Sequence, residues 1–133
     1  HRILHTRTFF IFHKQHHAFK DPTPFAGFAI HPVEAVVTFW PIILLVIPGA
    51  IHFAPLYFSA VVGFITLNLY LHCGVTFEWA EAVLPRIGLN SSAFHNKHHA
   101  RANVNFGEAS YIWDVICKTR LEDRSRPPRP AGT

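Results

Sequence analysis

The chain has 133 residues, about the length of one domain, and carries a formal net charge of +4. Half of its residues are hydrophobic and only 15% are charged, whereas about a quarter of the residues are charged in an ordinary soluble domain. This composition favours a lipid-facing protein. The basic residues gather towards the two ends instead of forming a stripe with interleaved aromatics, so no nucleic-acid partner is expected.

The cysteine content and the first residue give two further expectations. Cys73 and Cys117 are the only cysteines and lie far apart, so they make no disulfide framework, which fits a reducing compartment. The sequence contains no methionine and starts with His1, and we therefore expect it to be part of a longer protein. For the same reason no signal peptide can be sought in it.

Residues 1–20 are rich in histidine and compatible with a helix. Asp21-Pro22-Thr23-Pro24 ends that helix, because proline restricts both itself and the residue before it. A short apolar connection over residues 25–30 leads to His31-Pro32. We expect His31 to be a structural cap beside Glu34, with a role as metal ligand as the alternative.

The stretch from Val33 to Leu71 contains one acidic residue and no Lys or Arg, and Pro48-Gly49 interrupts it near its middle. A bilayer core about 30 Å thick needs a helix of roughly 20 residues. The stretch therefore predicts a membrane-embedded helical hairpin with arms over residues 33–47 and 55–71, the first arm kinked at Pro41. A buried helix pair in a soluble protein is the alternative.

A hairpin places both of its ends on the same side of the membrane. Because basic residues mark the cytoplasmic side, both histidine-rich ends are expected in the cytoplasm. His52, alone near the hairpin turn, is interpreted as structural. The sequence thus predicts an all-α fold, a membrane-embedded helical hairpin with a cytosolic, His-rich, helical metal-binding cap.

After His72 the sequence becomes polar. Residues 78–84 predict a short amphipathic helix that Pro85 stops. Asn90-Ser91-Ser92 offers N-cap residues for a helix that carries three histidines. The Arg- and Pro-rich residues 121–133 predict a disordered tail or linker.

Histidine spacing is the main functional signal. His1 and His5 are four residues apart, and the pattern H-x-x-H-H occurs twice, at residues 13–17 and 95–99. Residues three and four apart share one face of an α-helix, so each triplet should direct two or three imidazoles towards a common point. His72 ends the apolar segment, with Asn68 one turn before it on the same face.

Nine clustered histidines are too many for one metal ion, which takes about four to six ligands, and about right for two. A single histidine is more often structural, but two such triplets in one short chain favour a shared metal site. The Glu-x-x-His signature of soluble di-iron bundles is absent, as are H-E-x-x-H, C-x-x-C and G-x-S-x-G. Redox or oxygen chemistry is therefore favoured over hydrolysis.

Three segments, HRILH, HKQHH and FHNKHH, stand in the order of the three histidine boxes of the fatty acid hydroxylase/sterol desaturase superfamily, which residues 1 to about 120 resemble. The stretches TPFA and HPVE after the second box resemble C-5 sterol desaturases most closely. The sequences N-F-G and W-D after the third box also resemble the family. Cys117-Lys118-Thr119 departs from its usual Phe-Gly-Thr.

The resemblance implies an integral-membrane di-iron oxidoreductase that uses O2 and an electron donor, such as cytochrome b5 or a ferredoxin, to hydroxylate or desaturate a lipid, with a sterol favoured. It implies a catalytic domain over residues 1–120 and a tail over residues 121–133. Asn68 matches a position that is His in some relatives. The implied metal ligands are His1, His5, His13, His16, His17, His72, His95, His98, His99 and Asn68.

Several alternatives stay open. Fatty acid, sphingoid or carotenoid substrates fit the same histidine boxes. A non-enzymatic metal-binding membrane protein and an inactive structural homologue are further alternatives, and intact boxes argue against the second. Imidazole accepts both iron and zinc, so the two metals are not distinguished.

Overall fold

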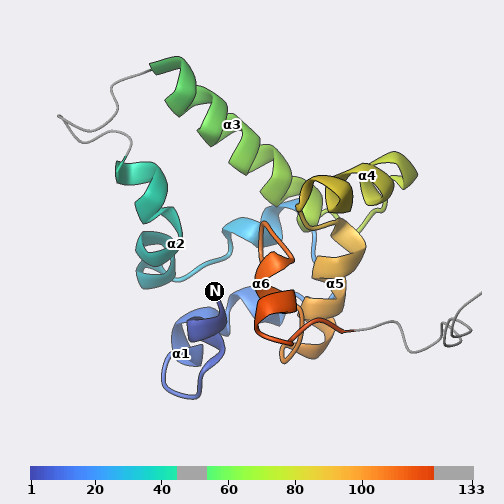
Figure 1. The fold of residues 1–133 in the computed structure, drawn as a ribbon. Coiled ribbons are helices and arrows are strands. Elements are labelled where there is room, and N and C mark those ends of the chain that lie inside the picture. The colour runs from blue at the N-terminus through green and yellow to red at the C-terminus, as the bar shows by residue number, and fades with distance from the viewer. Residues whose placement is uncertain (45–53, 122–133) are drawn as a thin grey trace, which may run out of the picture.

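The structure, a computed structural model, describes residues 1–44 and 54–121 (Figure 1). Within these ranges every regular element is a helix, which confirms the all-α prediction. The predicted turn at Pro48-Gly49, His52 and the tail over residues 122–133 lie outside the described residues. The elements are the 3-10 helices η1 (Arg2–His5), η2 (His16–Ala18), η3 (Pro24–Phe28) and η4 (Leu84–Ile87), and the α-helices α1 (Phe10–His13), α2 (Pro32–Leu44), α3 (Ala54–Leu71), α4 (Glu78–Val83), α5 (Ser92–Arg101) and α6 (Ile112–Ile116).

The histidine-rich segment over residues 1–20 is not one helix, as its composition suggested, but three short pieces, η1, α1 and η2. The Thr6 hydroxyl donates to the carbonyl of Ile3 at 2.8 Å, a local bond that competes with helix continuation. A turn then follows before α1 begins at Phe10. This break lets the chain fold back, so that the first two histidines can face those that follow.

Helices α2 and α3 extend away from the cluster of short helices that contains α5 and α6 (Figure 1). Pro32 opens α2, as suits a residue without a backbone N–H, and the helix runs on past Pro41. The two helices touch where the rings of Phe39 and Phe64 meet edge to face, 5.5 Å between centroids. Among the described helices, α3 is the one long and apolar enough to cross a membrane, with a mean hydropathy of 1.5.

Signals at the helix ends match the predicted caps. Ser91 is the N-cap of α5, and its hydroxyl accepts a hydrogen bond from the backbone N–H of Phe94 at 3.4 Å. Ala102, in the left-handed conformation, ends the same helix. Helix α4 ends at Val83, and the chain continues through Pro85 as the 3-10 helix η4.

Polar side chains fill the centre of the molecule. The buried apolar side chains of the described part are few, namely Leu4, Pro22, Ala26, Leu71 and Ala80. The polar groups buried with them are more numerous, and they include five of the nine histidines singled out from the sequence, each less than 3% exposed: His13, His72, His95, His98 and His99. Since burying polar groups is unfavourable unless they are satisfied, this interior needs specific partners.

Candidate metal centre

The nine histidines singled out from the sequence converge in two groups at the centre of the short helices. Within each group, one ring nitrogen from every histidine lies within 4.8 Å of the corresponding nitrogens of the others. The five-histidine group consists of His1, His5, His13, His17 and His98. The four-histidine group consists of His16, His72, His95 and His99.

Each H-x-x-H-H triplet divides between the two groups. In the first triplet, His13 and His17 join the five-histidine group while His16 joins the other. In the second, His95 and His99 stand together and His98 crosses over. The single common point expected for each triplet is thus replaced by two. In α5, which carries the whole second triplet, residues i and i+4 lie close in angle around the helix and residue i+3 lies on the other flank of that face.

The spacing between ring nitrogens within the groups suits a metal ion. The Nε2 atoms of His1 and His13 are 2.8 Å apart, and those of His95 and His72 are 3.0 Å apart. Imidazole nitrogens bind zinc at about 2.0–2.1 Å, and two such bonds at a right angle separate the nitrogens by about 3.0 Å. The groups therefore have the dimensions of coordination shells.

Hydrogen bonds at the far side of the rings fix which nitrogen faces inward. The Nδ1 of His1 lies 2.8 Å from the carbonyl oxygen of Phe106, and the Nδ1 of His98 lies 2.8 Å from that of Val104. A carbonyl only accepts, so each Nδ1 carries the hydrogen and each neutral ring turns a bare Nε2 lone pair inward. His72 and His99 make the same kind of bond to the carbonyls of Asn68 and Phe19.

Lone pairs that face each other at about 3 Å repel unless a cation lies between them, and burial opposes making the rings cationic instead. Burial lowers the pKa of His98 to about 4 and, together with the neighbouring His72, that of His99 to about 3. Burial and nearby histidines lower the pKa of His5 to about 2 and that of His17 to about 3. These four rings are thus neutral imidazoles at pH 7, which is the form that binds iron or zinc.

Glu34 provides a carboxylate behind the five-histidine group. Its Oε1 lies 2.5 Å from Nδ1 of His13, and both side chains are buried. A carboxylate that accepts from a metal-binding histidine fixes the ring's tautomer and makes the other nitrogen a better donor. Glu34 stood out in the sequence as the only acidic residue of a long apolar stretch, but spacing alone did not connect it to His13.

Asn68 lies at the end of α3 beside the four-histidine group. Its side chain is buried, and its Oδ1 has no hydrogen-bond partner. The amide nitrogen of Asn68 donates to Oε1 of Glu108 at 3.5 Å. Desolvation inside the fold, followed by the charge of Glu34, raises the pKa of Glu108. Sequence reasoning missed Glu108, which carries no local motif of its own.

A small cavity touches both histidine groups. Its volume is about 10 Å³, which is roughly the space that one water molecule needs. The cavity thus places a small, polar volume next to both candidate coordination shells. Its polar lining consists of His1, His13, His16, Glu34, Thr38, Asn68 and Glu108.

The loop after α5 is held by the two C-terminal motifs. Asp114 of the W-D pair accepts from the backbone N–H groups of Phe106 and Gly107, each at 2.7 Å, and from the hydroxyl of Thr119 at 2.6 Å. Asn105 has a positive φ of 54°, which asparagine tolerates better than most residues. These residues position the carbonyls that hold His1 and His98.

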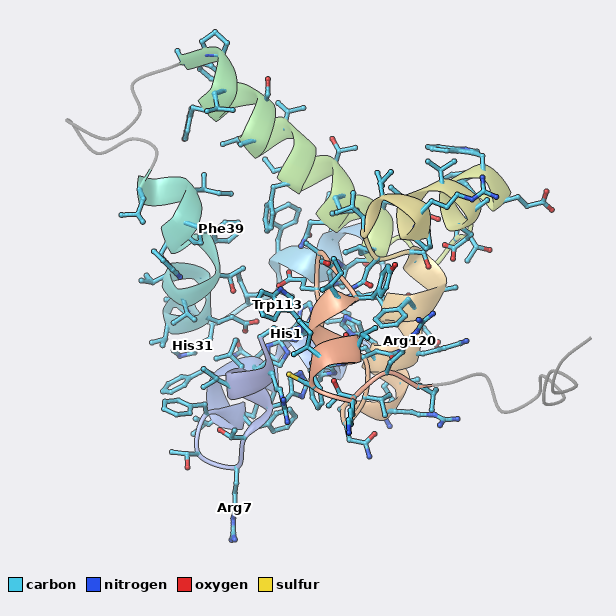
Figure 2. All side chains as sticks on the ribbon, in the orientation of Figure 1. His1, Arg7, His31, Phe39, Trp113 and Arg120 are labelled. Atoms are coloured by element: carbon cyan, nitrogen blue, oxygen red, sulfur yellow. The ribbon has the colours of Figure 1, made fainter. Side chains whose placement is uncertain are left out.

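His31 lies outside both groups. Its Nδ1 accepts from the backbone N–H of Val33 at 3.2 Å, at the start of α2, and its ring packs on Phe12 at 5.0 Å between centroids. This local contact supports the interpretation of His31 as a cap. Figure 2 shows His31 at the edge of the molecule beside α2.

Known proteins resemble this chain along most of its length. Residues 1–119 match the sequence profile of a family described as "Fatty acid hydroxylase". The chain is 33% identical over 117 residues to a lathosterol oxidase of Rattus norvegicus and 32% identical to one of Homo sapiens, each alignment covering 87% of this chain and 38% of the relative. A Delta(7)-sterol 5(6)-desaturase of Gibberella zeae is 31% identical over 86% of this chain and 31% of its own length. The chain thus spans less than two fifths of these relatives, and no solved structure matches it significantly.

Proposed function

The chain belongs to the fatty acid hydroxylase family, and we propose from this membership and from its histidine groups that it forms the metal-binding, catalytic part of a membrane oxidase. The reaction is the O2-dependent hydroxylation or desaturation of a lipid. The observation that carries the proposal is the inward convergence of nine imidazoles into groups of five and four. That arrangement supports two metal ions, one for each group.

Iron is the proposed metal, and when bound it supplies the redox chemistry with O2 that no side chain of the protein can perform. The five-histidine group would hold one ion, and the four-histidine group would hold the other. Asn68 is a further proposed ligand of the four-histidine group, supported by its buried and unpartnered Oδ1. The protein's own task is to hold ten donors in place and to keep their rings neutral.

The surrounding residues orient the donors and exclude water. Backbone carbonyls and Glu34 fix the tautomers of five rings, so that no ring has to reorient when metal binds. All four histidines of the four-histidine group are buried, and His72 and His98 have no solvent-exposed surface. A buried, preorganised group of this kind would limit side reactions with solvent during the oxidation.

The lipid substrate and the membrane location rest on α3 and on the named relatives. Much of α3 lies uncovered in the described structure, and exposed side chains along it include Phe58 at 63% and Val62 at 61%. Such a helix is suited to contact with lipid tails, with the histidine groups at its cytoplasmic end. Because the relatives are named lathosterol oxidase and sterol desaturase, a sterol or sterol-like lipid is the proposed substrate.

The first test is the metal content of the full-length protein, purified without oxygen in mild detergent after growth on iron-57. We expect about two irons per chain that are coupled in the Mössbauer spectrum, together with oxygen consumption when a Delta(7)-sterol and an electron donor are supplied. Zinc without iron uptake or oxygen consumption would contradict the proposal and favour a metal-binding role without redox chemistry.

A further inference from the structure

A second, larger cavity lies against α5, outside the histidine groups. Its volume is about 470 Å³, and Phe94, Lys97, Asn105, Tyr111 and Arg120 are among the residues that line it. Helix α5 therefore lies between the buried histidine groups and this cavity. Its histidines are buried on the inner side, while Lys97 is exposed at the cavity.

The surface at this cavity is basic, because Lys97 and Arg120 line it and Arg101 lies one helical turn beyond Lys97. Lys97 and Arg101 are four residues apart on α5, so they share one face of the helix, and both are exposed. Arg120 is also exposed, and its guanidinium lies over the ring of Tyr111, 5.2 Å from the ring centroid. Figure 2 shows Arg120 beside α5.

One acidic residue, Glu81, lines the cavity within the described part of the chain. Its Oε1 already accepts hydrogen bonds from the hydroxyl of Tyr70 at 2.7 Å and from the backbone N–H of Ala93 at 3.3 Å. Glu81 is thus engaged at the base of α5 and leaves the charges of Lys97, Arg101 and Arg120 available to a partner.

A short connection leads from the cavity wall to the five-histidine group. Asn105 lines the cavity, is fully buried, and donates to the carbonyl of Phe94 at 3.2 Å. The carbonyls on its two sides, those of Val104 and Phe106, accept from His98 and His1 respectively, each at 2.8 Å. One peptide unit and one hydrogen bond therefore join Asn105 to His98, and the backbone of Phe106 and one hydrogen bond join it to His1.

We propose that this basic surface, formed by Lys97 and Arg120 at the cavity and by the neighbouring Arg101, is the docking surface of an acidic one-electron carrier protein. Electrons then pass through residues 104–106 to the five-histidine group. The inference rests on the proposed function, which requires an external reductant. Each docking oxidises one carrier by one electron and reduces one metal ion by one. Two dockings supply the two electrons that, with two from the lipid, reduce O2 to the level of water.

Charge complementarity explains why the partner is acidic. Basic groups around a docking site raise the association rate of an acidic protein, and salt screens that effect. Such a surface should act mainly on the rate of encounter, because rim charges steer the partner more than they hold it.

The test uses the full-length protein with its metal, in discs of neutral lipid, and reduced soluble cytochrome b5 and reduced plant-type ferredoxin as probes. Carrier oxidation is followed by stopped flow at several salt concentrations. For the triple variant K97E/R101E/R120E we expect the second-order rate constant to fall at least about tenfold and to lose its decrease with salt. The matched control R7E/K14E/K20E changes the charge equally at exposed residues of the first segment and should keep the wild-type rate.

Two controls separate the possible failures. Reduction of the metal by photoreduced deazariboflavin, a small uncharged donor, should be the same in all three proteins, which shows that the site is intact. Wild-type rates and salt dependence in the triple variant would overturn the docking proposal alone. The docking proposal alone would also be overturned if loss of binding to vesicles with anionic lipid were the only change in the triple variant. Absence of iron, or of its reduction by deazariboflavin, in the wild type would overturn the proposed function as well.

Discussion

The contact between Glu34 and His13 is the only one in which a carboxylate, and not a backbone carbonyl, faces the outer nitrogen of a box histidine in the described structure. Replacing Glu34 by Gln keeps the size of the side chain and removes its charge. We expect the affinity of the five-histidine group for metal to fall about 10–100-fold, as for other residues that orient a ligand. Competition with a chromophoric chelator measures this change.

The matched control for Glu34→Gln is Glu78→Gln, because Glu78 is exposed in the first turn of α4, away from both groups. It should leave metal affinity unchanged. Equal affinities in the wild type and in Glu34→Gln would show that the carboxylate does not orient His13.

His98 and His31 allow a second comparison at the residue scale. His98→Ala removes one donor of the five-histidine group, and we expect loss of bound iron and at least about a hundredfold loss of activity. His31→Ala removes only a contact at the start of α2, so it should lower stability by about 1 kcal/mol and keep both irons. Metal analysis and thermal unfolding measure the two effects, and a fully active His98→Ala with intact metal would refute its assignment.

At the scale of elements, the close approach of η3 to the end of α3 requires glycine at position 27. A Cβ there would lie 2.1 Å from Oδ1 of Asn68 and 2.9 Å from Nδ1 of His72. Gly27→Ala should therefore displace α3 from η3, destabilise the protein by about 1–3 kcal/mol and weaken the four-histidine group. Metal content and unfolding temperature are the measurements.

Gly63→Ala is the control for this substitution, since a Cβ at Gly63, also in α3, meets nothing within 4 Å. It should retain metal and stability. If Gly27→Ala behaves like Gly63→Ala, the packing of η3 against α3 does not determine the geometry of the site.

The whole molecule has an interior made largely of imidazole, and this links folding to metal. With few buried apolar side chains, the described part gains little from hydrophobic burial, while its histidine lone pairs repel one another. We expect removal of the metal by a chelator to lower the unfolding temperature strongly, because metal bound only by the folded state stabilises it. Calorimetry with and without added Fe(II) measures the shift, and equal unfolding temperatures would contradict the expectation.

The metal-free protein should also lose stability in acid. Since burial lowers the pKa of His98 to about 4 and of His99 to about 3, while the unfolded value is 6.5, the unfolded chain binds more protons between these values. Stability is therefore fully present above about pH 6.5. It falls by about 1.4 kcal/mol per pH unit for each such histidine as the pH decreases towards 4. Denaturant unfolding at pH 7, 6 and 5 measures the slope, and constant stability over this range would contradict it.

The sequence alone determined the helical class, the family resemblance and which nine histidines gather in two groups, because the motifs that carry most of them are local in the chain. Ser91 as an N-cap was predictable for the same reason, since a cap acts on residues within one turn. The break at Thr6 was not predictable, because it depends on the tertiary packing that brings His1 and His5 together with His13 and His17 in one group.

Only the tertiary structure decided how the histidines divide. Spacing placed His13, His16 and His17 on one side of a helix, but the side chains around them determine which rings meet across the fold. His98 joins His1 and His5, nearly a hundred residues earlier, while its neighbour His99 joins His16 and His72. The tertiary structure likewise brought Glu34 to His13 and the carbonyls of residues 104 and 106 to His98 and His1. Such contacts between distant segments have no local signal, because they arise only when the packed helices bring those segments together.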